Sequence, residues 1–173
     1  MPHGTVAVLA TDSTLDHGAI LTGLAMSDTE DTHLDIHCIG FESPAPDAFA
    51  MGSVVPISWP DDGAALARAE ALEAELRPIV PKHRCNVAFC RQTLREGSVG
   101  SELPPVIRFA DWIVAAAPHD TQDRSSQVAV LEAALFVGGL PVIVVPKEGV
   151  EIARAPTRIA VAWDGSREAL AAV

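Results

Sequence analysis

The strongest constraint on the fold is a set of five short apolar runs separated by segments of helical character. The runs cover residues 6–10, 34–41, 86–91, 112–117 and 141–145. The first and last show little of the polar alternation typical of a strand with one face in water, so we expect strands covered on both faces. Strands that alternate with helices predict right-handed crossovers. The expected fold is therefore α/β, an open five-stranded parallel sheet with helices on both faces.

Helical patterns fill the intervals between the runs. Asp12, Ser13 and Thr14 supply helix-capping side chains and predict a helix over residues 15–27. An amphipathic pattern covers residues 64–81, where Pro78 should kink or end the helix.

Two further helices are expected between the later runs. One covers residues 101–111, with Pro104 and Pro105 in its first turn. The other covers residues 125–137 and should stop at Gly138-Gly139. Its expected apolar side consists of Val128, Leu131, Leu135 and Phe136.

Residues 158–166 echo the beginning of the chain. Both segments are apolar runs that end in an aspartate and a small polar residue, Asp12 with Ser13 and Asp164 with Gly165 and Ser166. The aspartates lie about 150 residues apart, the size of one ordinary domain. We therefore expect one complete domain over residues 1–147, a linker over 148–157, and the start of a second, truncated copy over 158–173. Residues 159–163 would form one extra C-terminal strand.

Charge and composition exclude several classes of partner. The net charge is −11, from 23 acidic and 12 basic residues, and a field of that sign repels nucleic-acid backbones and anionic lipid. No apolar run reaches the roughly 18 residues of a membrane span, and no signal peptide is visible, so we expect a cytoplasmic protein. The cysteines Cys38, Cys85 and Cys90 are odd in number and lack a CxxC motif, which favours reduced thiols.

Ligands of open parallel sheets bind at the carboxyl ends of the strands, where the strand order reverses. Asp12 has two open roles, as a helix cap or as a ligand contact. The start of the helix after the fourth run has the same two readings, capping or the binding of a small anion. The candidate ligand-binding residues are Asp12, Ser13, Gly40, Pro118, His119, Arg124, Ser125 and Ser126.

Taken together, these motifs resemble the universal stress protein family in its tandem two-domain form. The resemblance is carried by the aspartate that ends the first run and its echo, by Ala-Asp-Trp-Ile-Val at 110–114, and by Leu-Glu-Ala-Ala-Leu-Phe at 131–136 followed by Pro-Val-Ile-Val-Val-Pro at 141–146. It implies a Rossmann-like fold of the adenine nucleotide alpha hydrolase type and a role in stress response. It also implies a homodimer formed through the last strand, Pro141 to Val145.

The resemblance does not extend to the ATP signature of the family. ATP-binding members carry G-x2-G-x9-G-[S/T] after the fourth strand, whose glycines let backbone N–H groups approach phosphate. Here the first two glycine positions fall at His119 and Gln122, and no glycine occurs between Gly100 and Gly138. The same loop carries two acidic residues that oppose a triphosphate, Asp120 and Asp123. We therefore expect a binding module for a small molecule or a protein partner, without ATP or another cofactor.

Two alternatives stay open. The first is an ATP- or AMP-binding universal stress protein with an atypical loop. The second is a small hydrolase-like enzyme in which Asp12 and His119 do acid/base work, which requires the two side chains to lie within hydrogen-bonding reach. No G-x-S-x-G elbow surrounds Ser13 and no cysteine–histidine spacing is typical of zinc, so no catalytic residue or metal ligand is assigned.

Overall fold

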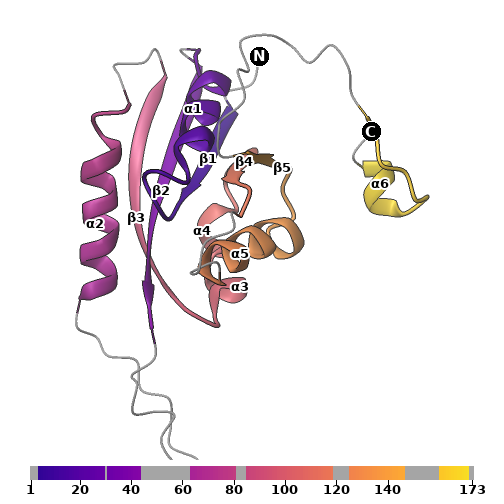
Figure 1. Ribbon diagram of the computed structural model, residues 1–173. Helices are drawn as coiled ribbons and strands as arrows, with labels where there is room; N and C mark the ends of the chain where they lie inside the picture. Colours follow the sequence, from indigo (N-terminus) through magenta and orange to yellow (C-terminus); the bar gives the residue numbers. More distant parts are fainter. Residues whose placement is uncertain are drawn as a thin grey trace, which may run out of the picture.

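The computed structural model describes residues 4–29, 31–43, 63–80, 85–118, 125–146 and 160–171. Strands and helices alternate along most of the chain (Figure 1). The elements are β1 (Gly4–Ala10), α1 (His17–Met26), β2 (Thr32–Glu42), α2 (Ala64–Leu76), β3 (Asn86–Arg95), α3 (Val99–Glu102), α4 (Pro104–Ile107), β4 (Trp112–Ala116), α5 (Ser125–Glu132), the π-helix η2 (Ala133–Val137), β5 (Val142–Val145) and α6 (Arg167–Ala171).

The five strands form one parallel sheet in the order β3-β2-β1-β4-β5, which confirms the predicted α/β class. β1 is the central strand, with Leu9 beside His37 of β2 and beside Ala115 of β4. Residues 6–10 are at most 4% exposed, because both faces of β1 are covered. The unbroken apolar run at the start of the sequence reflects this burial.

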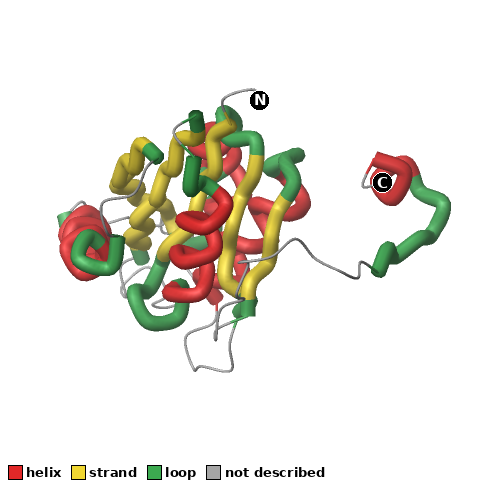
Figure 2. Tube along the Cα trace, turned by 90° about the horizontal axis from the view of Figure 1, so that it is seen from above, coloured by secondary structure: helices red, strands yellow, loops and turns green. Residues whose placement is uncertain are grey.

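Helices cover both faces of the sheet (Figure 2). On one face, Ile20 and Leu24 of α1 and Leu72 of α2 pack against Val8 and Ile36 of the strands. On the other face, residues of the segment that contains α3 and α4, and of α5 and η2, pack against Leu9, Ile39 and Ile113 of the strands. The helical residues of this second cluster include Val99, Leu103, Ile107, Val130 and Ala133. Each fully buried aliphatic side chain contributes about 1.5–3 kcal/mol through the hydrophobic effect.

The helices occur where the sequence predicts them, with two local differences near prolines. α2 ends at Leu76, two residues before Pro78, as expected of a residue that cannot continue a helix. The single helix expected over residues 101–111 is instead two short helices, α3 and α4, which meet at Leu103. Pro104 and Pro105 lack N–H groups, so the backbone bonds of α3 cannot continue through them.

The predicted apolar side of the helix over residues 125–137 is wrong in its second half. Leu135 and Phe136 are 43% and 80% exposed, whereas Ala133 and Ala134 are buried. The buried residues Val130, Ala133 and Ala134 have the i, i+3, i+4 spacing of one helical face, which lies one residue before the expected face. The helix then stops at Gly138-Gly139 as expected, with Gly139 at φ +66°.

The expected extra C-terminal strand is not formed by its described residues. Residues 160–163 have no strand structure and are exposed. A strand exists only through hydrogen bonds to a neighbour, and the sheet contains no sixth strand among the described residues. The short helix α6 follows Asp164, where the sequence predicts the first helix of the second copy to begin.

Cys38, Cys85 and Cys90 are free thiols, as predicted, and burial raises the pKa of Cys38 to about 12. Within the described parts of the chain, every helix is too short or too polar to cross a membrane.

Gly40 packs directly against helix α2 and is buried in β2. A Cβ atom at this position would lie 1.9 Å from the carbonyl oxygen of Ala65 in α2. The close approach of strand and helix therefore requires glycine here, which accounts for this residue without a ligand.

We expect Gly40→Ala to destabilise the protein by about 3 kcal/mol, since the backbone of α2 must move to admit the methyl group. Gly100→Ala is the matched control, because a Cβ there has nothing within 4 Å and alanine favours the helix by up to about 1 kcal/mol. Urea denaturation measures both. Equal midpoints for the two variants would show that the approach of α2 to β2 is not tight.

Candidate functional site

The strand order reverses between β1 and β4. From β1 the chain moves outward to β2 and β3, then crosses to β4 and β5 on the other side. The helices that follow β1 and β4, which are α1 and α5, pack on opposite faces of the sheet. Ligands of open α/β sheets bind at the carboxyl edge beside such a reversal of strand order.

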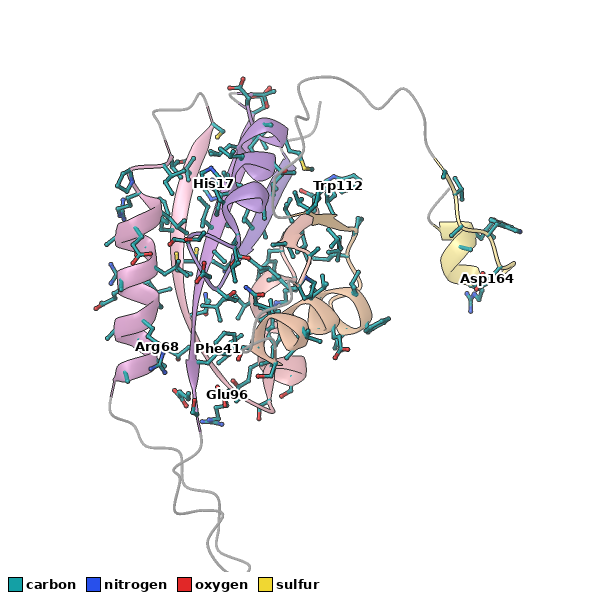
Figure 3. All side chains as sticks on the ribbon, viewed as in Figure 1. His17, Phe41, Arg68, Glu96, Trp112 and Asp164 are labelled. Carbon is teal, nitrogen blue, oxygen red and sulfur yellow. The ribbon has the colours of Figure 1, made fainter. Side chains whose placement is uncertain are left out.

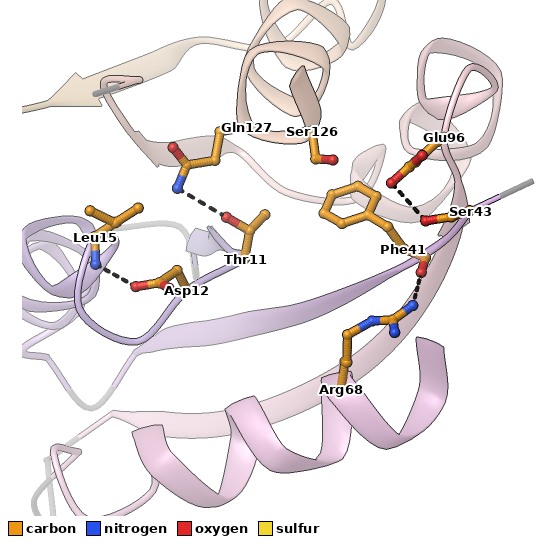
Figure 4. Close-up of a pocket in the computed structure, with 9 residues that line it drawn as sticks. All are labelled: Thr11, Asp12, Leu15, Phe41, Ser43, Arg68, Glu96, Ser126 and Gln127. Atoms are coloured by element: carbon orange, nitrogen blue, oxygen red, sulfur yellow. Dashed lines mark hydrogen bonds between the residues drawn. The ribbon is translucent and has the colours of Figure 1, made fainter. Parts of the chain in front are cut away.

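A cavity of about 560 Å³ occupies this edge (Figure 4). The β1–α1 loop forms one side, the beginning of α5 another, and the ends of β2 and β3 with α2 the third. The volume suits a ligand of small-molecule size. The lining residues are Thr11, Asp12, Leu15, Phe41, Ser43, Arg68, Glu96, Ser126 and Gln127.

The buried carboxyl group of Asp16 holds the β1–α1 loop. Asp16 is 3% exposed, and its Oδ2 accepts hydrogen bonds from Thr11 N at 2.5 Å, Asp12 N at 2.9 Å and Thr11 Oγ1 at 3.1 Å. Burial raises the pKa of Asp16, and the hydrogen bonds from Thr11 and Asp12 oppose that rise. Asp16 therefore fixes the backbone where β1 meets the cavity.

Asp12 closes a tight turn in the same loop. Its Oδ1 accepts hydrogen bonds from Thr14 N and Leu15 N, both at 2.8 Å. The helix-capping role expected for Asp12 is not found, because α1 begins at His17 with Asp16 at its N-cap position. The Asp12 carboxylate is exposed and lines the cavity, so the turn and a contact to a ligand are compatible.

Thr11 and Gln127 join the two sides of the crevice. Gln127 Nε2 of α5 donates to Thr11 Oγ1 at 3.4 Å, across 116 positions of sequence. The threonine hydroxyl in turn donates to Asp16. The polar floor of the cavity is thus a chain of hydrogen bonds from α5 to the buried carboxyl group.

The opposite rim lies at the ends of β2 and β3. Arg68 of α2 donates to the carbonyl oxygen of Phe41, and Ser43 Oγ donates to Glu96 Oε1 at 3.0 Å. Figure 3 shows Phe41, Arg68 and Glu96 together at one end of the sheet, away from Trp112. The rim therefore carries one aromatic ring, one guanidinium and one carboxylate.

Of the residues that the sequence proposes for the site, Asp12 and Ser126 line the cavity. Ser13, Gly40, Pro118 and Ser125 are described but are not among its lining residues, and packing accounts for Gly40. His119 and Arg124 lie outside the described residues. The acid/base pair of Asp12 and His119 therefore stays a hypothesis.

Several site residues were missed in the sequence. Asp16 had a signal, because it lies on the same helical face as Ile20 and Leu24, where a carboxylate must be buried. Arg68, Glu96 and Gln127 had none, since each reads as an ordinary polar residue of a helix or loop. In the described residues, no group of three or more histidine, cysteine or acidic side chains is arranged to hold a metal ion.

The fold and the site define an α/β protein with a doubly wound parallel sheet and an open cavity at its switch point. No protein-family model matches the chain, and neither does any curated protein.

We expect Asp16→Ala to cost about 2–3 kcal/mol of stability, because two backbone N–H groups lose their shared acceptor. Asp16→Asn is the control. All three hydrogen bonds go to one oxygen, so an amide oxygen in that position retains them and the cost should stay below about 1 kcal/mol. Chemical denaturation measures the free energy of unfolding of both variants. Equal losses of stability would mean that the hydrogen-bond acceptor does not account for the contribution of Asp16.

The unmodified protein and Asp16→Asn should also differ in how their stability depends on pH. A carboxyl group whose folded pKa is raised stabilises the fold most below its ordinary pKa, and that contribution is lost as pH rises through the folded pKa. Relative to Asp16→Asn, the unmodified protein should therefore lose stability as pH rises from about 4. Denaturation of both proteins across this range tests the sign, and a difference that moves the other way contradicts the raised pKa.

Proposed function

We propose that the chain is a small-molecule binding module of the universal stress protein type, with a role in stress response and without the usual ATP site. The observation that carries the proposal is the switch-point cavity, lined by Thr11, Asp12 and Gln127 from the elements that diverge there. The motifs shared with that family support the family type and the stress role.

The repeated aspartate turn adds support for a tandem origin. Asp164 Oδ1 accepts a hydrogen bond from Ser166 N at 2.8 Å, as Asp12 does from Thr14 N at the same spacing. A helix follows each turn. The division into residues 1–147, 148–157 and 158–173 belongs to this proposal.

The cavity lining favours a ligand other than ATP. Among the described residues that line the cavity, Asp12 and Glu96 are carboxylates and Arg68 is the one cation. A triphosphate would meet repulsion from both carboxylates. This agrees with the absence of the family's glycine signature from the sequence.

A native mass spectrum of the purified protein, compared with its denatured mass, tests the ligand. After incubation with ATP, AMP and magnesium, we expect no adduct of nucleotide mass. A retained nucleotide in either state would instead establish the alternative, an atypical ATP- or AMP-binding member.

We further propose that the protein forms a homodimer through β5. This strand lies at the edge of the sheet and pairs with β4 alone. It carries no charge between Val142 and Val145, and Val144 is 43% exposed. An uncharged apolar edge strand is a surface that favours pairing with another strand.

Val144→Lys should convert the dimer to a monomer, because lysine on an edge strand opposes pairing. Leu66→Lys is the matched control, since Leu66 has a similar exposure of 46% but lies on α2. Light scattering after size exclusion measures both masses. A monomer in the unmodified protein, or an unchanged mass for Val144→Lys, would remove β5 as the interface.

A further inference from the structure

A small chamber lies against the polar floor of the switch-point cavity. Its volume is about 10 Å³, which is about the room needed by one water molecule or one ammonium group. Thr11 and Gln127 line both the chamber and the cavity. Asp16 lines the chamber, and its other walls are mainly apolar residues of β1, β4 and α5. A ligand in the cavity can therefore present one small polar group to the chamber.

Gln127 offers that group an acceptor. Its Oε1 atom is buried and has no hydrogen-bond partner in the described structure, while its Nε2 is used by Thr11. A buried carbonyl oxygen without a donor is costly, and native structures almost always satisfy it. The group that satisfies this oxygen has to be an N–H or O–H donor, and a ligand in the cavity can supply one.

The charges around the cavity decide whether a cationic, neutral or anionic donor is favoured. Among the described lining residues, Asp12 and Glu96 contribute two carboxylates against the guanidinium of Arg68, and that guanidinium already donates to a backbone carbonyl at the rim. The aromatic ring of Phe41 lines the same cavity and offers a surface against which a ring of the ligand can pack. Acceptors and negative charge therefore dominate the surface that meets a ligand.

We propose that the ligand of this cavity is a small organic cation, a ring-bearing primary amine whose ammonium group donates to Gln127 Oε1 while its ring lies against Phe41. The inference rests on the binding function proposed above and specifies the chemistry of its ligand. An ammonium group has three donors and no acceptor, which matches a floor made of Gln127 Oε1, the Thr11 hydroxyl and nearby carboxylates.

Three probes of one shape test the head group: 2-phenylethylamine, 2-phenylethanol and phenylacetate. They share the ring and differ in being cationic, neutral and anionic at pH 7. Titration of the full chain, followed by NMR, should give an amine affinity at least tenfold above that of phenylacetate, with the alcohol between them. Equal affinities, a preference for the acid, or no binding of the amine would overturn the proposal.

Two variants test where the ammonium group of the ligand binds. Gln127→Met keeps the side-chain length but removes the acceptor, and it should weaken amine binding at least tenfold. Glu96→Gln removes a charge from the rim, and it should reduce the preference for amine over acid several-fold. Ser125→Ala is the control, because this exposed residue of the same helix is not among the lining residues. Circular dichroism checks that each variant folds, and unchanged amine affinity in folded Gln127→Met would overturn the assignment.

The failures of the two proposals can be distinguished. If the native mass spectrum shows a retained small molecule while the amine is not preferred, the binding function stands and the cation inference falls. If the purified protein retains nothing and none of the three probes shifts the resonances of the cavity residues, both fall.

Discussion

The buried carboxyl group of Asp16 is the interaction on which the candidate site depends. It lies at the start of α1, directly under the carboxyl end of the central strand, and it gathers three donors from Thr11 and Asp12 on one oxygen. Removing a carboxyl group from water is unfavourable, and these hydrogen bonds offset that cost. Because the Thr11 hydroxyl is fixed this way, it is also positioned to accept from Gln127 of α5. One buried side chain thus links the loop, the floor of the cavity and the helix across the crevice.

Much of the fold could be predicted because parallel strands buried on both faces require unbroken apolar sequence. The runs at residues 6–10 and 112–117 correspond to β1 and β4, at the centre of the sheet. The sequence was less informative where local chemistry competes with periodicity. Pro104 divides a helix that the apolar spacing alone would continue. The strand expected over residues 159–163 is a different failure, since a strand needs a neighbour and no pattern within the segment supplies one.

The site was predictable in place but only partly in composition. The alternation of strands and helices predicts a site at the carboxyl ends of the strands, and Asp12 and Ser126 line the cavity there because each lies next to the end of a strand or the start of a helix. Arg68 and Glu96 belong to parts of the chain whose sequence contains no motif typical of a binding site. The position of Arg68 depends on how α2 packs against β2, which Gly40 permits through its contact with Ala65. Glu96 follows β3 and accepts a hydrogen bond from Ser43 after β2. Such residues follow from the tertiary structure alone.

The π-turn of η2 has a consequence for how this region tolerates change in its length. A π-turn accommodates one more residue than an α-turn over the same stretch of axis, so the helix can gain or lose a residue here while its two ends stay in place. α5 then keeps Gln127 at the cavity, and β5 keeps its register with β4. The π-turn itself carries the exposed side chains of Leu135 and Phe136. This helix can therefore vary its outer surface by single-residue insertion or deletion while the sheet and the cavity remain unchanged.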